Sequence, residues 1–153
     1  MSFYQRINND LKDAMKAGDN FKVSALRMFL SVFHNKEIEK KGKGLEPALT
    51  DEEIIEILGR EAKKRKESAE IYIKGGRQDL AGKESGELEI INKYLPEQIG
   101  SEEIEKIVAA IIEKTGAKDI KNFGKVMGEA MKELKGKADA SLVSEIVRKK
   151  LGS

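Results

Sequence analysis

The spacing of apolar residues is helical along nearly the whole chain, and no stretch alternates with the period of a β-strand. Phe3, Ile7, Leu11 and Met15 recur every four residues, behind a serine that can cap a helix and before a glycine that can end it. Residues 50–53, Thr-Asp-Glu-Glu, form a capping-box sequence that begins another, longer helical stretch. This pattern predicts an all-α fold.

A helix-breaking segment divides the chain. Residues 94–98, Tyr-Leu-Pro-Glu-Gln, interrupt the helical spacing because proline disfavours helical geometry at the residue before it. Gly100 and Ser101 then supply a turn and a helix start. We therefore expect two lobes: residues 1–96 as an N-terminal helical bundle with long helices, and residues 97–153 as a C-terminal domain of three helices.

Composition limits the classes of function. The 29 Lys and Arg residues nearly balance the 27 Asp and Glu residues and leave a net charge of +2, so any affinity for nucleic acid must come from local clusters. The longest uncharged apolar run, residues 107–112, is far shorter than the roughly 20 residues of a membrane span, so no membrane partner is expected. With no cysteine and no apolar leader in its first residues, the sequence predicts a cytoplasmic protein.

No residue pattern indicates catalysis or metal binding. The absence of cysteine removes thiol nucleophiles and zinc knuckles, and the only histidine, His34, has no serine or carboxylate at the spacing of a catalytic site. Carboxylate pairs such as Glu52-Glu53 suit helix capping better than acid–base chemistry. We therefore expect no catalytic residue, no metal and no cofactor.

Two groups of basic residues are the candidates for a binding site. The first lies around a turn, Lys-Gly-Lys-Ala-Asp, in which Gly136 ends one helix and Asp139 caps the next. Its cations, the candidate RNA-binding set, are Lys125, Lys132, Lys135 and Lys137. The second group is a secondary basic patch of Arg60, Lys63, Lys64, Arg65 and Lys66. Such side chains bind phosphates, but acidic residues flank the second group and favour a solvated helix face there. For the first group, RNA contact and an ordinary surface turn both stay open.

Gly124 and Gly128 lie four residues apart in the helical stretch before that turn. Glycines at this spacing allow another backbone to approach closely. We interpret the pair as a site of tight helix packing, in preference to a contact with a ligand or an RNA backbone.

Two motifs, YLPEQ at residues 94–98 and GKVMGEAMKELKGKAD at residues 124–139, resemble the GatB/YqeY family, and the likeness to its stand-alone YqeY form covers nearly the whole chain. The C-terminal lobe is similar to the tail domain of the B subunit of the tRNA-dependent amidotransferase. The resemblance implies an all-helical, two-lobed protein whose smaller lobe matches a module that contacts the body of tRNA. It also implies the label of a carbon–nitrogen ligase with glutamine as amido-N-donor, although 153 residues contain neither the catalytic cradle nor the glutaminase of that enzyme.

These observations lead to the hypothesis of a non-catalytic accessory protein that binds tRNA or associates with a tRNA amidotransferase. The expected partners are tRNA and a tRNA-modifying or aminoacylation-linked protein. The alternative is a protein-interaction adaptor that makes no RNA contact. An autonomous amidotransferase is the weakest of the three hypotheses, because nothing in the sequence supplies its chemistry.

Overall fold

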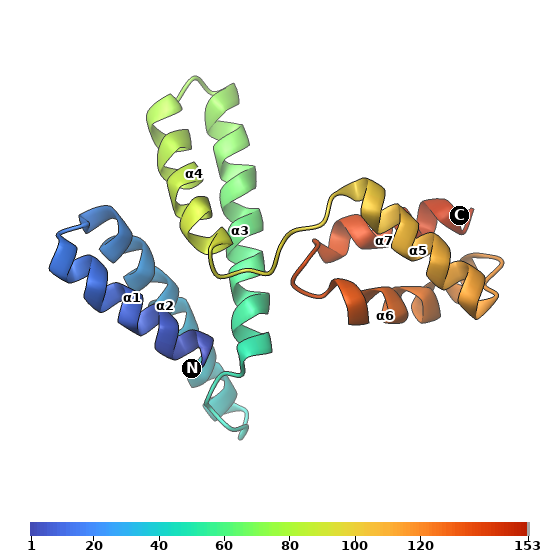
Figure 1. The fold of residues 1–153 in the computed structure, drawn as a ribbon, viewed down its shortest axis with the longest axis horizontal. Coiled ribbons are helices and arrows are strands. Elements are labelled where there is room, and N and C mark those ends of the chain that lie inside the picture. Colours follow the sequence, from blue (N-terminus) through green and yellow to red (C-terminus); the bar gives the residue numbers. More distant parts are fainter. Residues whose placement is uncertain (153) are drawn as a thin grey trace. The chain divides into compact units, whose positions relative to one another are not determined.

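The computed structural model describes residues 1–152, and within them every regular element is a helix, which confirms the predicted all-α class (Figure 1). The chain forms two compact units, Met1–Leu95 and a second that begins at Pro96. The N-terminal unit holds α1 (Phe3–Ala17), α2 (Asn20–Gly42), α3 (Asp51–Lys74) and α4 (Gln78–Asn92). The C-terminal unit holds α5 (Ser101–Thr115), a short 3-10 helix (Ile120–Asn122), α6 (Phe123–Leu134) and α7 (Ala140–Lys150).

Local sequence signals set both ends of α1 and the start of α3 where they were expected. Ser2 and Thr50 each accept a hydrogen bond from the backbone N–H three residues later, and the side chains of Gln5 and Glu53 bond back to complete both capping boxes. Gly18 ends α1 in the left-handed conformation, with φ of 70°, which glycine adopts at little cost. The boundaries of these helices are therefore decided by residues that neighbour each other in the sequence.

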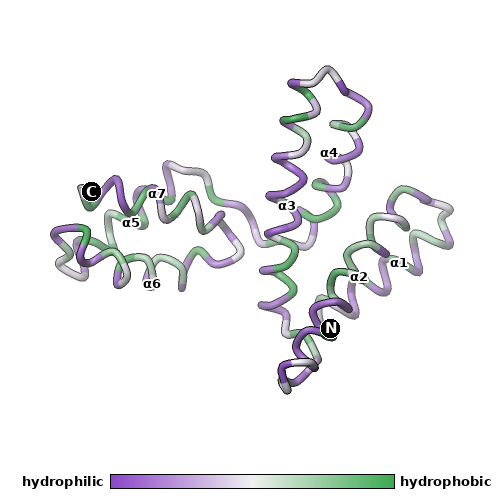
Figure 2. Tube along the Cα trace, turned by 180° about the vertical axis from the view of Figure 1, so that it is seen from behind, coloured by the Kyte–Doolittle hydropathy of each residue, from purple (hydrophilic) through white to green (hydrophobic). Residues whose placement is uncertain are grey.

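The N-terminal unit consists of two helical hairpins, α1–α2 and α3–α4, packed around one apolar core. Its largest fully buried side chains are Ile7, Leu26, Phe29, Phe33, Ile54, Leu58 and Ile91. Each such side chain contributes about 1.5–3 kcal/mol when it leaves water. Figure 2 shows that hydrophobic and hydrophilic residues alternate over short distances along the helices. Such alternation is expected when one face of a helix lies in a core.

The C-terminal unit is a three-helix domain in which α5, α6 and α7 each pack on the other two. Its core is lined by aliphatic side chains, chiefly Ile104, Val108, Val126, Leu134, Val143 and Val147. Among residues 1–152, no helix is long and apolar enough to cross a membrane.

Candidate nucleic-acid interface

The Lys-Gly-Lys-Ala-Asp turn joins α6 to α7 and has a fixed backbone. Gly136 adopts a left-handed φ of 78°, and the N–H of Lys137 donates to the carbonyl of Leu134 at 2.9 Å. Asp139 is the N-cap of α7, and its carboxylate accepts from the N–H of Ser141 at 3.1 Å. The side chains of Lys135 and Lys137 are exposed on either side of the glycine. The turn therefore presents two ammonium groups on a backbone that is already ordered.

The YLPEQ segment and the residue after it, Ile99, hold this turn in place. The Gln98 amide donates from Nε2 to the carbonyl of Gly136 at 2.8 Å, and the N–H of Ile99 donates to the carbonyl of Lys137 at 2.9 Å. Gln98 and Gly136 are 38 residues apart in the sequence, so these bonds join two distant segments. In the sequence, the first motif marks a boundary and the second contains a turn, but neither predicts this contact.

The other end of the same segment is held in the N-terminal unit. Tyr94 is only 4% exposed, its hydroxyl donates to the carboxylate of Asp10, and the Arg6 guanidinium lies 5.1 Å from the centre of its ring. Burial, followed by the hydrogen bond to Asp10, raises the pKa of the Tyr94 hydroxyl. Tyr94 is thus anchored in the N-terminal unit and Gln98 in the C-terminal unit, with Leu95, Pro96 and Glu97 between them.

The exposed face of α6 carries the other two candidate lysines. Lys125 and Lys132 are exposed, and Lys132 donates from Nζ to Glu129 Oε1 at 2.9 Å. The hydrogen bond and the charge of Lys132 hold the pKa of the Glu129 carboxyl below its ordinary value. An exposed pair of this kind contributes little to stability, so the lysine can exchange its partner for another anion.

The interpretation of Gly124 and Gly128 as a packing site is wrong. Within the C-terminal unit as the structure describes it, and apart from their own helix, no atom lies within 4 Å of the place that a β-carbon would occupy at either position. Both glycines are exposed on the same helix as Lys125 and Lys132. The helix that was expected to approach them packs instead on the opposite, apolar face of α6, where the core residues lie.

The secondary basic patch loses its central member. Arg65 was expected to be a surface cation, but it is only 5% exposed. Its Nε donates to Glu87 Oε2 at 2.9 Å, its Nη1 donates to Glu61, and its guanidinium lies 5.2 Å from the centre of the Phe29 ring. Buried guanidinium groups need such partners, because a charge without them is costly to remove from water. Arg65 therefore belongs to the core of the N-terminal unit.

The remaining residues of that patch are spread around α3. Arg60 forms an ion pair with Glu56 one turn earlier, Lys63 is half-buried, and Lys64 and Lys66 are exposed. Helical geometry places residues 64 and 66 about 200° apart around the axis, so they do not share a face. This arrangement is typical of a solvated helix surface with mixed charge.

Among residues 1–152, the structure shows no group of three or more His, Cys, Asp or Glu side chains that could hold a metal ion. His34 lies on α2 with an exposed side chain, and its Nδ1 is 3.5 Å from Glu37 Oε2 on the same helix. The exposed lysines on either side of Gly136 can attract anions.

The fold and the site together define a class: a small all-α protein of two helical units, the second of which carries exposed lysines around a braced turn. The chain belongs to the Yqey-like protein family, whose model matches residues 4–151. This confirms the family expected from the two motifs.

Two relatives illustrate the family. "Altered inheritance of mitochondria protein 41, mitochondrial" from Vanderwaltozyma polyspora is 34% identical over 161 aligned residues, which cover 97% of this chain and 84% of the relative. The protein of the same name from Saccharomyces cerevisiae is 33% identical over 129 residues, which cover 80% of this chain and 67% of the relative.

The expected cytoplasmic location is contradicted by these relatives, because both are named as mitochondrial proteins. The physical reason for the error is that the absence of cysteine excludes disulfide bonds but does not distinguish one reducing compartment from another.

Proposed function

We propose that this protein is a non-catalytic accessory protein that binds tRNA through its C-terminal unit. The observation that carries the proposal is the exposed surface of α6 and of the turn after it. This surface combines Lys125, Lys132, Lys135 and Lys137 with two glycines that have open space beside them. The likeness of this unit to the tail domain of a tRNA-dependent amidotransferase supports tRNA as the ligand.

Gly124 and Gly128 favour an external partner, because each of them destabilises the helix in which it lies. A glycine inside an exposed helix destabilises it by about 1 kcal/mol relative to alanine. Neither Gly124 nor Gly128 makes room for another part of the C-terminal unit as it is described. A sugar–phosphate backbone that lies against α6 between the lysines would use the space that these residues leave.

The low aromatic content favours a structured RNA over a single strand. Only 5% of the residues are aromatic, and a protein that binds single strands commonly stacks bases on aromatic side chains. A folded RNA is recognised mainly through its shape and its backbone, for which lysines on an ordered turn are sufficient.

A titration of the full chain with bulk tRNA, followed by fluorescence anisotropy at low and moderate salt, tests the proposal. Micromolar binding at low salt is expected, and the double variant Lys135→Ala/Lys137→Ala should weaken it and reduce the salt slope by about 0.7–0.9 for each lost phosphate contact. The matched control, Lys64→Ala/Lys66→Ala, removes the same charge from exposed positions on α3. Absence of binding by the unmodified chain, or an equal loss in the control, would sink the proposal.

One observation favours the alternative of a protein-interaction adaptor. Ile71 and Ile73, in the last turn of α3, are 67% and 53% exposed, which is unusual for isoleucines. They lie beside the Gly75-Gly76 turn at the end of the α3–α4 hairpin (Figure 1). A protein partner that persists after nuclease treatment and is lost from the variant Ile71→Ser/Ile73→Ser would favour this function over RNA binding.

A further inference from the structure

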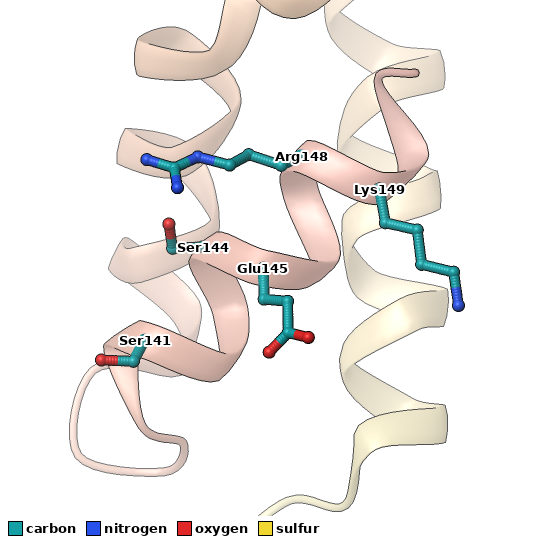
Figure 3. Close-up of a pocket in the computed structure, with 5 residues that line it drawn as sticks. All are labelled: Ser141, Ser144, Glu145, Arg148 and Lys149. Carbon is teal, nitrogen blue, oxygen red and sulfur yellow. The ribbon is translucent and has the colours of Figure 1, made fainter. Parts of the chain in front are cut away.

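The solvent face of α7 forms an open groove of about 570 Å³, separate from the candidate lysines on α6 and the turn. Its lining consists of five polar side chains: Ser141, Ser144, Glu145, Arg148 and Lys149 (Figure 3). The opposite face of α7 lies in the core and carries Val143 and Val147. A groove with this lining suits a polar ligand, because hydroxyl, carboxylate and cationic groups line it.

Arg148 is held in a defined orientation. Its guanidinium lies 5.1 Å from the centre of the Phe123 ring, at the start of α6, so the side chain crosses from one helix to the next. Figure 3 shows the guanidinium extending sideways from α7, with the Ser144 hydroxyl on the same side one turn earlier. A guanidinium ordered in this way by an aromatic ring loses less entropy when it binds a phosphate than a free lysine does.

The groove follows directly from the lysine turn. Ser141 is tied to the cap of α7 through the bond from its N–H to Asp139, and Ser144 and Arg148 follow at helical spacing on one side. From Ser141 to Arg148 the helix rises by about 10 Å, which is longer than a single phosphate group. Hydroxyl and guanidinium groups in such a row are the usual donors to the phosphates of a nucleic acid.

From this row we infer that the α7 groove is a second phosphate-binding segment for RNA, with Arg148 as its principal ligand. The inference rests on the proposed tRNA-binding function and extends the contact from the lysine turn along α7. The net charge of the groove is favourable, since Arg148 and Lys149 outnumber Glu145 by two to one. The carboxylate of Glu145 repels a phosphate, so removing its charge should raise the affinity for RNA, whereas removing Arg148 should lower it.

The experiment measures tRNA affinity of the full chain by anisotropy for four variants. Arg148→Ala should weaken binding about tenfold and lower the salt slope by about 0.9, and Arg148→Lys should restore only part of the loss because it keeps the charge without the planar group. Glu145→Gln should strengthen binding about two- to threefold, since it removes a repulsion. Lys106→Ala on α5, an exposed cation of the same unit, is the matched control and should change the affinity less than about twofold.

A gain of affinity in Glu145→Gln cannot arise from damage to the fold, so it separates ligand contact from a structural role. The inference is overturned if Arg148→Ala and Glu145→Gln both behave like the Lys106→Ala control while the double variant at Lys135 and Lys137 still loses affinity. That result leaves the proposed function standing. If the unmodified chain binds no tRNA, the proposed function fails and the groove has no RNA to bind.

Discussion

The two units place their charged side chains differently. In the N-terminal unit, Arg65 and Tyr94 are buried, and their hydrogen bonds to Glu87 and Asp10 join segments that are distant in the sequence. In the C-terminal unit, Lys135 and Lys137 lie outside on a turn whose backbone supplies its own hydrogen bonds. Two basic clusters that are both candidates in the sequence therefore differ in exposure, because exposure depends on what packs against each helix face. Substitutions in the first unit should change stability, and those in the second should change binding.

The largest effect is expected for Arg65→Ala. It leaves the carboxylates of Glu61 and Glu87 without their buried partner, and breaking such a pair costs about 3–5 kcal/mol. Urea denaturation should show this loss, whereas Lys64→Ala, the exposed neighbour, should change stability by less than about 0.5 kcal/mol. If Arg65→Ala were as stable as the unmodified chain and bound tRNA more weakly, the contrast between the two units would be broken.

Tyr94→Phe should come next, with a loss of about 1–2 kcal/mol for the bond from the hydroxyl to the Asp10 carboxylate. The pKa of Tyr94 is raised above its ordinary 10.0 in the folded protein, so the unfolded chain releases its proton first as the pH rises. Stability from this group is therefore complete below about pH 10 and declines as the pH approaches the folded-state pKa.

Urea midpoints measured at about pH 8 and about pH 10.5 check the direction of this effect. The unmodified chain should lose more stability between the two pH values than Tyr94→Phe does. An equal loss in both proteins would show that Tyr94 does not carry the alkaline dependence.

Gly128→Ala should have opposite effects on stability and on binding. The open space beside Gly128 accepts a methyl group, and alanine should stabilise α6 by up to about 1 kcal/mol. The same methyl group should weaken tRNA binding if the RNA backbone lies against α6. Gly82→Ala on α4, which also has open space, is the matched control and should stabilise its helix without changing the affinity. Unchanged affinity in Gly128→Ala would remove the glycine face from the proposed interface.

The smallest effect is expected for Gln98→Ala. Its side chain is exposed, and the bonds from its amide to the carbonyls of Gly136 and Pro96 should together contribute about 1 kcal/mol. Loss of the brace should loosen the turn and lower tRNA affinity less than removal of the two lysines does. Hydrogen exchange of the Lys137 and Ala138 amides, compared between the two proteins, measures the loosening directly.

Much of the fold could be predicted from neighbouring residues. The all-α class follows from the helical spacing, and the capping boxes at Ser2 and Thr50 mark two helix starts. The structure divides into its two compact units between Leu95 and Pro96, one residue before the expected boundary. These features depend on interactions between residues that are close in the sequence, so they can be predicted from the sequence alone.

By itself, then, the sequence determined the helices, the family motifs and the identity of every candidate cation. Only the tertiary structure decided which cations are exposed, because burial depends on segments that are distant in the sequence. In the sequence, Arg65 is one cation in a basic run. In the structure, Phe29 from α2 and Glu87 from α4 contact its guanidinium and bury it. The sequence predicts that Gly128 is a packing position, but the structure has open space beside it. Helical periodicity assigns a residue to a face, but only the packing of other helices determines whether that face is covered or open.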